Sequence, residues 1–272
     1  MADAGLFGPE SVIWRVNREG VLLLGGGRAL ILQVAHPLVA AGVAEHSNYR
    51  EDPWGRLQRT LDITYRVVFG DTDTAETAAR QLWLMHGRVE GETRENGGRY
   101  PAGTPYRAHD PELLMWVHAT LVDTSLLVYE RYVGQLSSAD RLRYYDEQRL
   151  LGEKFGVPLD RQPATYGEFQ EYVADMLASD RIAVTDALRD VVDATMHPRL
   201  PFVAWPVIRT VNLATVGMLP PGLRRELGLA WGPKRERLLR ASRRVLRNLL
   251  PLVPDIARHA PPARSAARRA AA

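Results

Sequence analysis

The sequence predicts an all-α fold, a single globular multi-helix domain, on three observations. No segment alternates apolar and polar residues between hairpin turns, so no sheet of consequence is expected. Apolar residues recur instead at helical spacing, in stretches that begin at recognisable start signals such as Asp-Pro. The chain has 272 residues, of which 46% are hydrophobic, and this is enough to bury a full core.

The first long apolar stretch predicts a buried helix with a kink. A short helix from Ser11 comes before it, and the glycines at 25–27 mark a break in the chain. Residues 29–44 then span about 24 Å as a helix, short of the ~30 Å hydrocarbon core of a bilayer, so no transmembrane segment is expected. Pro37 has no amide N–H to donate, which predicts a bend beside His36. The bend forms a pocket wall, or it only fits the helix to its neighbours.

Six further helices follow from start signals and apolar spacing. They are expected at 52–69, at 75–91 with Thr72 or Thr74 as cap, from Asp110, at 137–155, at 165–178 and after Pro206. A last helix starts at Pro233, and five of its apolar residues are expected to face inward: Leu238, Leu239, Val245, Leu246 and Leu249. The Ala/Arg-rich tail 260–272 is expected to be disordered, which leaves residues 1–259 as the folded domain.

Composition excludes several classes of protein. The chain has no cysteine, which excludes disulfides, thiolate metal sites and cysteine nucleophiles. Its first residues lack the basic and apolar regions of a signal peptide, so a cytoplasmic location is expected.

The charge is unevenly distributed along the chain. Residues 234–272 hold eleven basic and two acidic residues, a net charge of +9, which leaves −6 on the first 233. A solvated basic helix accounts for this, and no nucleic acid is expected as a partner. Peripheral contact with an anionic membrane through the basic C-terminal helix is the alternative.

Three histidines fall on apolar faces of three predicted helices: His36, His86 and His118. Each is a hydrogen-bonded core residue or a ligand to iron, copper or zinc. None of the seven histidines has an acidic residue three positions before it, which disfavours a ferritin-like di-iron site. HExxH and GxSxG motifs are also absent. A mononuclear metal site at His86 with Glu90 or Asp123 remains an alternative.

A haem fits the residue pattern better than a bare metal ion. It requires one axial histidine, an apolar slot and one or two arginines for the propionates. His86 lies on one helical face with Leu82 and Met85, while Arg56 and Thr60 are four residues apart and share a face of the preceding helix.

Five blocks of the sequence, in order, resemble a known family. They are GRALILQVAHPLVAAGVAEHS, DPWGRLQRTL, FGD, HGRVEG and DPELLMWVHATLVDT. The chain resembles over residues 7–235 the DUF2236 or MpaB-like oxygenases, the family of the catalytic domain of latex-clearing (rubber-cleaving) oxygenases. The resemblance implies a globin-like helical core, a haem b (iron) held by one proximal histidine, and oxidative cleavage of isoprenoid C=C bonds with O2.

The same resemblance implies roles for individual residues. The family's Arg-x-x-x-Thr motif matches Arg56 and Thr60, its proximal histidine matches His86, and a second pocket-side histidine matches His118. Distal basic chemistry falls near Arg59, where the rubber enzymes have a lysine.

Two further positions bear on the expected site. His36 is expected among the cofactor-contacting residues, where its imidazole hydrogen-bonds the carbonyls that Pro37 leaves unpaired. Glu90 stands one turn after the proximal histidine, where the family pattern implies a base, so this position departs from the pattern.

The expected function is therefore that of a haem-dependent oxygenase, an oxidoreductase. Its expected substrate is an apolar, alkene-bearing small molecule, isoprenoid or fatty acyl, with Arg56, Arg59, Thr60 and His118 as catalytic residues. Two alternatives stay open. One is a haem peroxidase or hydroxylase, and the other is a non-catalytic helical protein that binds a ligand or a membrane surface.

Overall fold

The computed structural model describes residues 3–50, 53–198 and 201–271, with the side chains of Pro53, Trp54, Arg56 and Phe202 outside that description. Within these ranges the chain has fourteen α-helices, four short 3-10 helices and one two-stranded sheet, which confirms the all-α prediction. The α-helices are α1 (Val12–Asn17), α2 (Gly26–Val34), α3 (Pro37–His46), α4 (Pro53–Phe69), α5 (Thr72–His86), α6 (Pro111–Tyr132), α7 (Ser138–Lys154), α8 (Tyr166–Ala178), α9 (Asp186–Met196), α10 (Trp205–Met218), α11 (Pro221–Glu226), α12 (Pro233–Leu249), α13 (Asp255–Arg258) and α14 (Pro261–Ala270). The 3-10 helices are η1 (Gly20–Gly25), η2 (Leu159–Arg161), η3 (Phe202–Ala204) and η4 (Leu250–Leu252), and the strands are β1 (Glu90–Glu92) and β2 (Pro105–Arg107).

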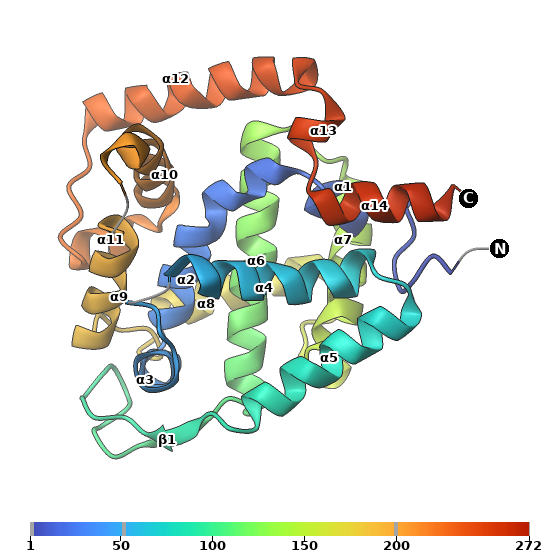
Figure 1. Cartoon of the computed structure of the whole chain (residues 1–272). Coiled ribbons are helices and arrows are strands. Elements are labelled where there is room, and N and C mark those ends of the chain that lie inside the picture. Colours follow the sequence, from blue (N-terminus) through green and yellow to red (C-terminus); the bar gives the residue numbers. More distant parts are fainter. Residues whose placement is uncertain (1–2, 51–52, 199–200, 272) are drawn as a thin grey trace.

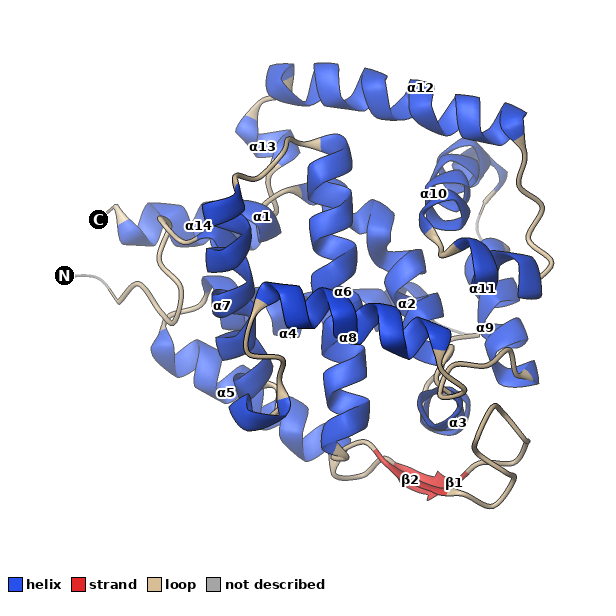
Figure 2. Ribbon diagram, turned by 180° about the vertical axis from the view of Figure 1, so that it is seen from behind, coloured by secondary structure: helices blue, strands red, loops and turns tan. Residues whose placement is uncertain are grey.

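Helix α6 runs through the middle of the molecule (Figures 1 and 2). It contacts η1, α2, α12, α1, α7 and α8, which is why apolar and small residues occupy most of its circumference. Its start is the one predicted: the Asp110 carboxylate accepts the amide N–H of Glu112 at 2.8 Å, and Pro111 follows as the first helical residue.

The glycine run 25–27 lies at the junction of η1 and α2, which is the break that the sequence predicted there. A Cβ on Gly25 would stand 2.6 Å from a methyl carbon of Thr124 in α6. A Cβ on Gly27 would stand 2.6 Å from the Thr215 hydroxyl in α10. These glycines let α2 lie against α6 and α10 at a separation that no side chain would allow.

The predicted single kinked helix at 29–44 is wrong in one respect, because it is two helices. The segments Gly20–Val34 and Pro37–His46 are bent by 110° relative to each other. His36 has an extended backbone and Pro37 is the first residue of α3, so the proline starts a new helix where a kink was expected. Among the described residues no single helix is long and apolar enough to cross a membrane, although this bent pair passes the same test jointly.

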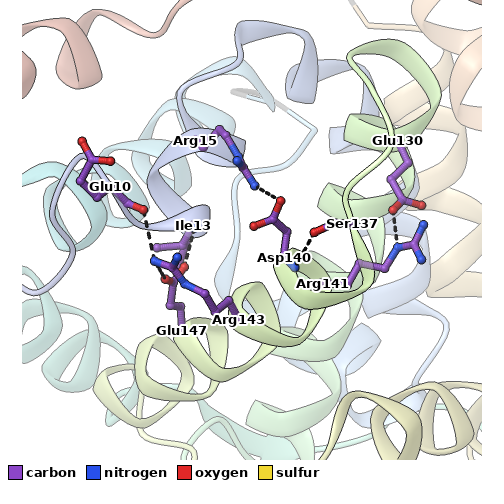
Figure 3. Close-up of polar contacts among 9 residues, drawn as sticks. All are labelled: Glu10, Ile13, Arg15, Glu130, Ser137, Asp140, Arg141, Arg143 and Glu147. Carbon is purple, nitrogen blue, oxygen red and sulfur yellow. Dashed lines mark hydrogen bonds and ion pairs between the residues drawn. The ribbon is translucent and has the colours of Figure 1, made fainter.

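Polar contacts connect α1 to α7 (Figure 3). The Glu147 carboxylate accepts the amide N–H of Ile13 at 2.6 Å, and Arg15 pairs with Asp140 at 2.7 Å. Ser137 caps α7 by accepting the amide N–H of Asp140 at 3.0 Å, as the Ser-x-x-Asp pattern predicted.

The described part of the C-terminal tail, residues 260–271, is folded, which corrects the expectation of disorder there. Residues 261–270 form α14, which packs on α4 with Ala263 and Ala266 buried. Arg269 donates to the carbonyl of Phe69 at 2.7 Å. Alanines on one face let the helix approach closely, so this low-complexity segment contacts the core without any large apolar residue.

A buried ion pair holds the preceding segment. The Glu19 carboxylate, 1% exposed, accepts two hydrogen bonds from Arg258 at 2.7 and 2.8 Å. Fork-to-fork pairing of this kind satisfies both charges at once, so it fixes the chain immediately before α14 to the end of α1.

The packing of α14 predicts a difference between two neighbouring alanines. Ala266 is 1% exposed whereas Ala267 is exposed. Ala266→Glu buries a carboxylate without a partner and should lower the free energy of unfolding by about 2 kcal/mol or more. The corresponding loss in Tm is about 4–8 °C. Ala267→Glu should leave Tm unchanged, and thermal melts in which the two variants agree would show that α14 does not pack on the body.

Candidate functional site

Helices α4 and α5 form a V, with buried residues near its closed end and mostly exposed or partly buried residues toward the ends that diverge. The two helices diverge from their connection at Gly70 and Asp71 (Figure 1). Buried residues cluster near this connection: Val67, Val68, Phe69, Ala75 and Ala78. Asp71 caps α5 by accepting the amide N–H of Thr74, so the cap is not Thr72 or Thr74 as predicted.

His86 is the last residue of α5 and lies at the open end of the V. Its side chain is partly buried, and its Nδ1 atom is buried without a hydrogen-bond partner. Within the described part of the chain neither of its ring nitrogens makes a hydrogen bond. Burial, with a smaller contribution from His109, lowers the pKa of His86 to about 4. The imidazole is therefore neutral at pH 7, which is the form that binds a metal.

Large apolar side chains are exposed just before His86. Trp83, Leu84 and Met85 are 47%, 61% and 49% exposed. Met85 was expected to face the core with Leu82, but only Leu82 is partly buried. Three consecutive exposed apolar residues are unusual on a closed surface and indicate a place where an apolar ligand or partner binds.

His109 is a neighbour of this histidine that the sequence did not reveal. Its ring stacks on Trp83 with 3.7 Å between centroids, and its Nε2 lies 2.9 Å from the carbonyl oxygen of Trp83. The His86 ring lies edge-on to it, with centroids 6.4 Å apart. A Cβ on Gly87 would stand 3.2 Å from the His109 ring, so Gly87 leaves room for this imidazole.

The pairing of β1 with β2 is what brings His109 back to the end of α5. Glu90 pairs with Arg107, and the amide of Ala108 donates to the carbonyl of Val89 at 2.8 Å. Nothing in the local sequence around residue 109 predicts this approach, because two three-residue strands are too short to give an alternating pattern.

The other two inward histidines each have one partner within the protein, at Nε2, while their Nδ1 atoms, like that of His86, are buried without a partner. His118 is 5% exposed, and its Nε2 donates to the carbonyl of Gln148 in α7 at 2.8 Å. His36 is 2% exposed, with its Nε2 3.2 Å from the Tyr100 hydroxyl. The expectation that His36 hydrogen-bonds the carbonyls near Pro37 is therefore wrong. No described contact joins either histidine to His86.

The predicted arginine and threonine residues lie on the first half of α4. Arg59 and Thr60 are exposed there, and Thr64 donates from its hydroxyl to the carbonyl of Thr60 at 3.0 Å. The side chain of Arg56 lies outside the described residues. The structure thus places this half of α4 and His86 at the same open end of the V (Figure 1).

The two residues suggested as further ligands of a bare metal ion at His86 are both engaged in ion pairs. Asp123 pairs with the buried Arg28 at 2.6 Å, and Glu90 pairs with Arg107 at 3.5 Å. Over the residues that the structure describes, no group of three or more His, Asp or Glu side chains can hold a metal ion. A site in which the protein supplies a single ligand is compatible with this arrangement.

Comparison with known proteins identifies the family. A family model described as "ER-bound oxygenase mpaB/B'/Rubber oxygenase, catalytic domain" matches residues 14–248. The chain belongs to this family. It is also 29% identical over 235 residues to uncharacterized proteins of Mycobacterium bovis and Mycobacterium tuberculosis, which covers 83% of this chain and 87% of theirs. No solved structure matches the chain.

Membership confirms the resemblance seen in the sequence and supports a general oxygenase activity, that of an oxidoreductase acting on a small molecule with O2.

Burial of His118 predicts a pH-dependent contribution to stability. Burial lowers the pKa of His118 from 6.5 to about 4, so the unfolded chain binds a proton more readily than the folded one between these values. The contribution of His118 to the free energy of unfolding is present above about pH 6.5 and is lost as the pH falls toward 4. Wild-type Tm should therefore fall over this window more steeply than that of His118→Gln. Parallel curves of Tm against pH would contradict a buried neutral imidazole.

Proposed function

We propose that the protein is a haem b-dependent oxygenase in which His86 would bind the iron. The observation that carries this proposal is the state of that histidine. It is neutral, without a hydrogen bond from the described chain, and placed beside exposed apolar side chains at the open end of the V. The family of oxygenase catalytic domains to which the chain belongs supports it.

The residues present fit a haem in three respects. Trp83, Leu84 and Met85 supply the apolar surface that a macrocycle buries. The buried Nδ1 of His86 and its unbonded Nε2 leave the ring without a competing protein partner. Arg59 and Thr60 offer a charge and a hydroxyl on α4, of the kinds that meet propionates or a distal polar ligand. We include Arg56 in this proposed group because it lies on the same helix, one turn before Thr60.

When bound, the haem would supply the activation of O2, chemistry that no protein side chain provides. The chain itself would orient the bound groups and exclude water. His86 would present its lone pair from a fixed helix end, while His109, stacked on Trp83, would limit rotation of the neighbouring ring. The apolar end of α5 would favour an apolar substrate, and we propose an alkene-bearing isoprenoid or fatty acyl compound, cleaved at its double bond.

Loss of a single histidine tests the axial assignment. The protein expressed with ample haem precursor should carry a pigment that acid–acetone extracts, since no Cys-x-x-Cys-His attachment motif is possible. His86→Ala should abolish the histidine-ligated visible spectrum, and added imidazole should restore it. His197→Ala is the matched control, because this exposed histidine contacts Asp193 of its own helix.

Two outcomes would count against the assignment. A colourless wild-type protein would remove the haem from the proposal. A normal histidine-ligated spectrum in His86→Ala would move the axial ligand to another residue.

Product analysis separates the proposed reaction from its rival. Incubation with an apolar alkene and labelled O2 should give two carbonyl fragments, each with one labelled oxygen, if the double bond is cleaved. A single hydroxylated product, or turnover that requires peroxide, would identify a haem hydroxylase or peroxidase instead. The His86→Ala protein is the control for haem-independent oxidation of the alkene.

A further inference from the structure

Helix α12 carries apolar side chains that the described chain leaves more than half exposed. Leu238, Val245 and Leu249 are 59%, 55% and 51% exposed, and their spacing puts them on one face of the helix. Leu252 and Ile256 follow in η4 and α13 at 77% and 72% exposed. These five residues, here named the α12 stripe, were expected in part to face inward. Only Leu239 of the helix is buried.

Basic side chains lie directly beside the α12 stripe. Arg237 and Arg244 each precede a stripe residue by one position, which places them about 100° round the helix on the same side. Both are exposed, and neither makes an ion pair in the described structure. Helix α12 as a whole has seven basic residues and one acid, Glu236.

The position of α12 leaves its whole length accessible. It lies along one edge of the molecule, away from the α4–α5 open end (Figure 1). It contacts α10 and α6 through its inner face, so the α12 stripe and its arginines belong to the outer part of the helix.

We propose that the α12 stripe docks this protein on an anionic phospholipid surface. A helix with one apolar face, flanking arginines and low mean hydropathy lies in the plane of the bilayer interface, with apolar side chains inserted and cations over phosphates. Charge decides against a second copy of the chain as the occupant. Two such faces packed together would bring their arginine rows into opposition at low salt.

Vesicle sedimentation tests the proposal with the full-length protein. Wild type should bind vesicles of phosphatidylcholine mixed with phosphatidylglycerol, and bind phosphatidylcholine alone weakly. Salt at about 0.5 M should reduce the binding, because it screens charges beyond a few ångströms. Leu238→Ser/Val245→Ser/Leu249→Ser should lower partition into anionic vesicles by roughly tenfold or more, since binding scales with buried apolar area.

A matched control and a second variant make the test decisive. Leu142→Ser/Leu150→Ser removes side chains that are 53% and 50% exposed on α7, and it should bind as wild type does. If the stripe variant does not fold, as judged by its thermal melt, Arg237→Gln/Arg244→Gln replaces it and should weaken binding to anionic vesicles only.

Three results would overturn the proposal. The first is wild-type binding no stronger to anionic than to zwitterionic vesicles. The second is equal binding by wild type and the stripe variant, or by wild type and the arginine variant where that variant replaces it. The third is light scattering that shows a dimer which the stripe substitutions dissociate, because it would assign the surface to a second copy.

Discussion

A buried guanidinium fixes the arrangement of the central helices. Arg28 of α2 is 5% exposed and donates to the Met218 carbonyl at 2.9 Å, the Thr124 hydroxyl at 2.5 Å and the Asp123 carboxylate at 2.6 Å. A charge removed from water is tolerated only when it is paired and fully hydrogen-bonded. The three helices α2, α6 and α10 must therefore keep one relative position, and the glycines at 25 and 27 allow the close approach that this requires.

The geometry of the candidate site follows from that arrangement through α3. The 110° bend at His36 and Pro37 directs α3 away from α2 and against the strand pair. There the Tyr106 hydroxyl donates to the Glu45 carboxylate at 2.6 Å, which holds β2 to α3. The residues just after β2 include His109, so the ring beside His86 is positioned by contacts that begin with the break at Pro37.

Local signals in the sequence predicted helix starts well. Asp110 and Ser137 cap their helices as expected, because a cap depends on residues within one turn. The identity of His86 as a candidate ligand also came from the sequence, through the order of the family blocks. Partners far along the chain could not be predicted in this way. The Tyr100 hydroxyl near His36 and the Gln148 carbonyl near His118 lie 64 and 30 residues away, and both decide whether a histidine is free to bind.

Helical periodicity shows which residues share one face of a helix, but it does not show what packs on that face. This explains the wrong predictions for α14 and α12. The alanines of α14 looked too small to form a core contact, yet they are buried because the surface of α4 accepts a thin helix. The leucines of α12 looked like core residues, yet α10 and α6 cover only the side that carries Leu239.

Two exposed apolar regions result from this packing, and their charge distinguishes their partners. Trp83, Leu84 and Met85 adjoin a neutral histidine at the end of α5, an environment that favours an uncharged, apolar ligand. The α12 stripe adjoins arginines on a helix that lies along one edge of the molecule. An extended anionic surface matches that charge, so the two proposals place chemistry and attachment on separate parts of one fold.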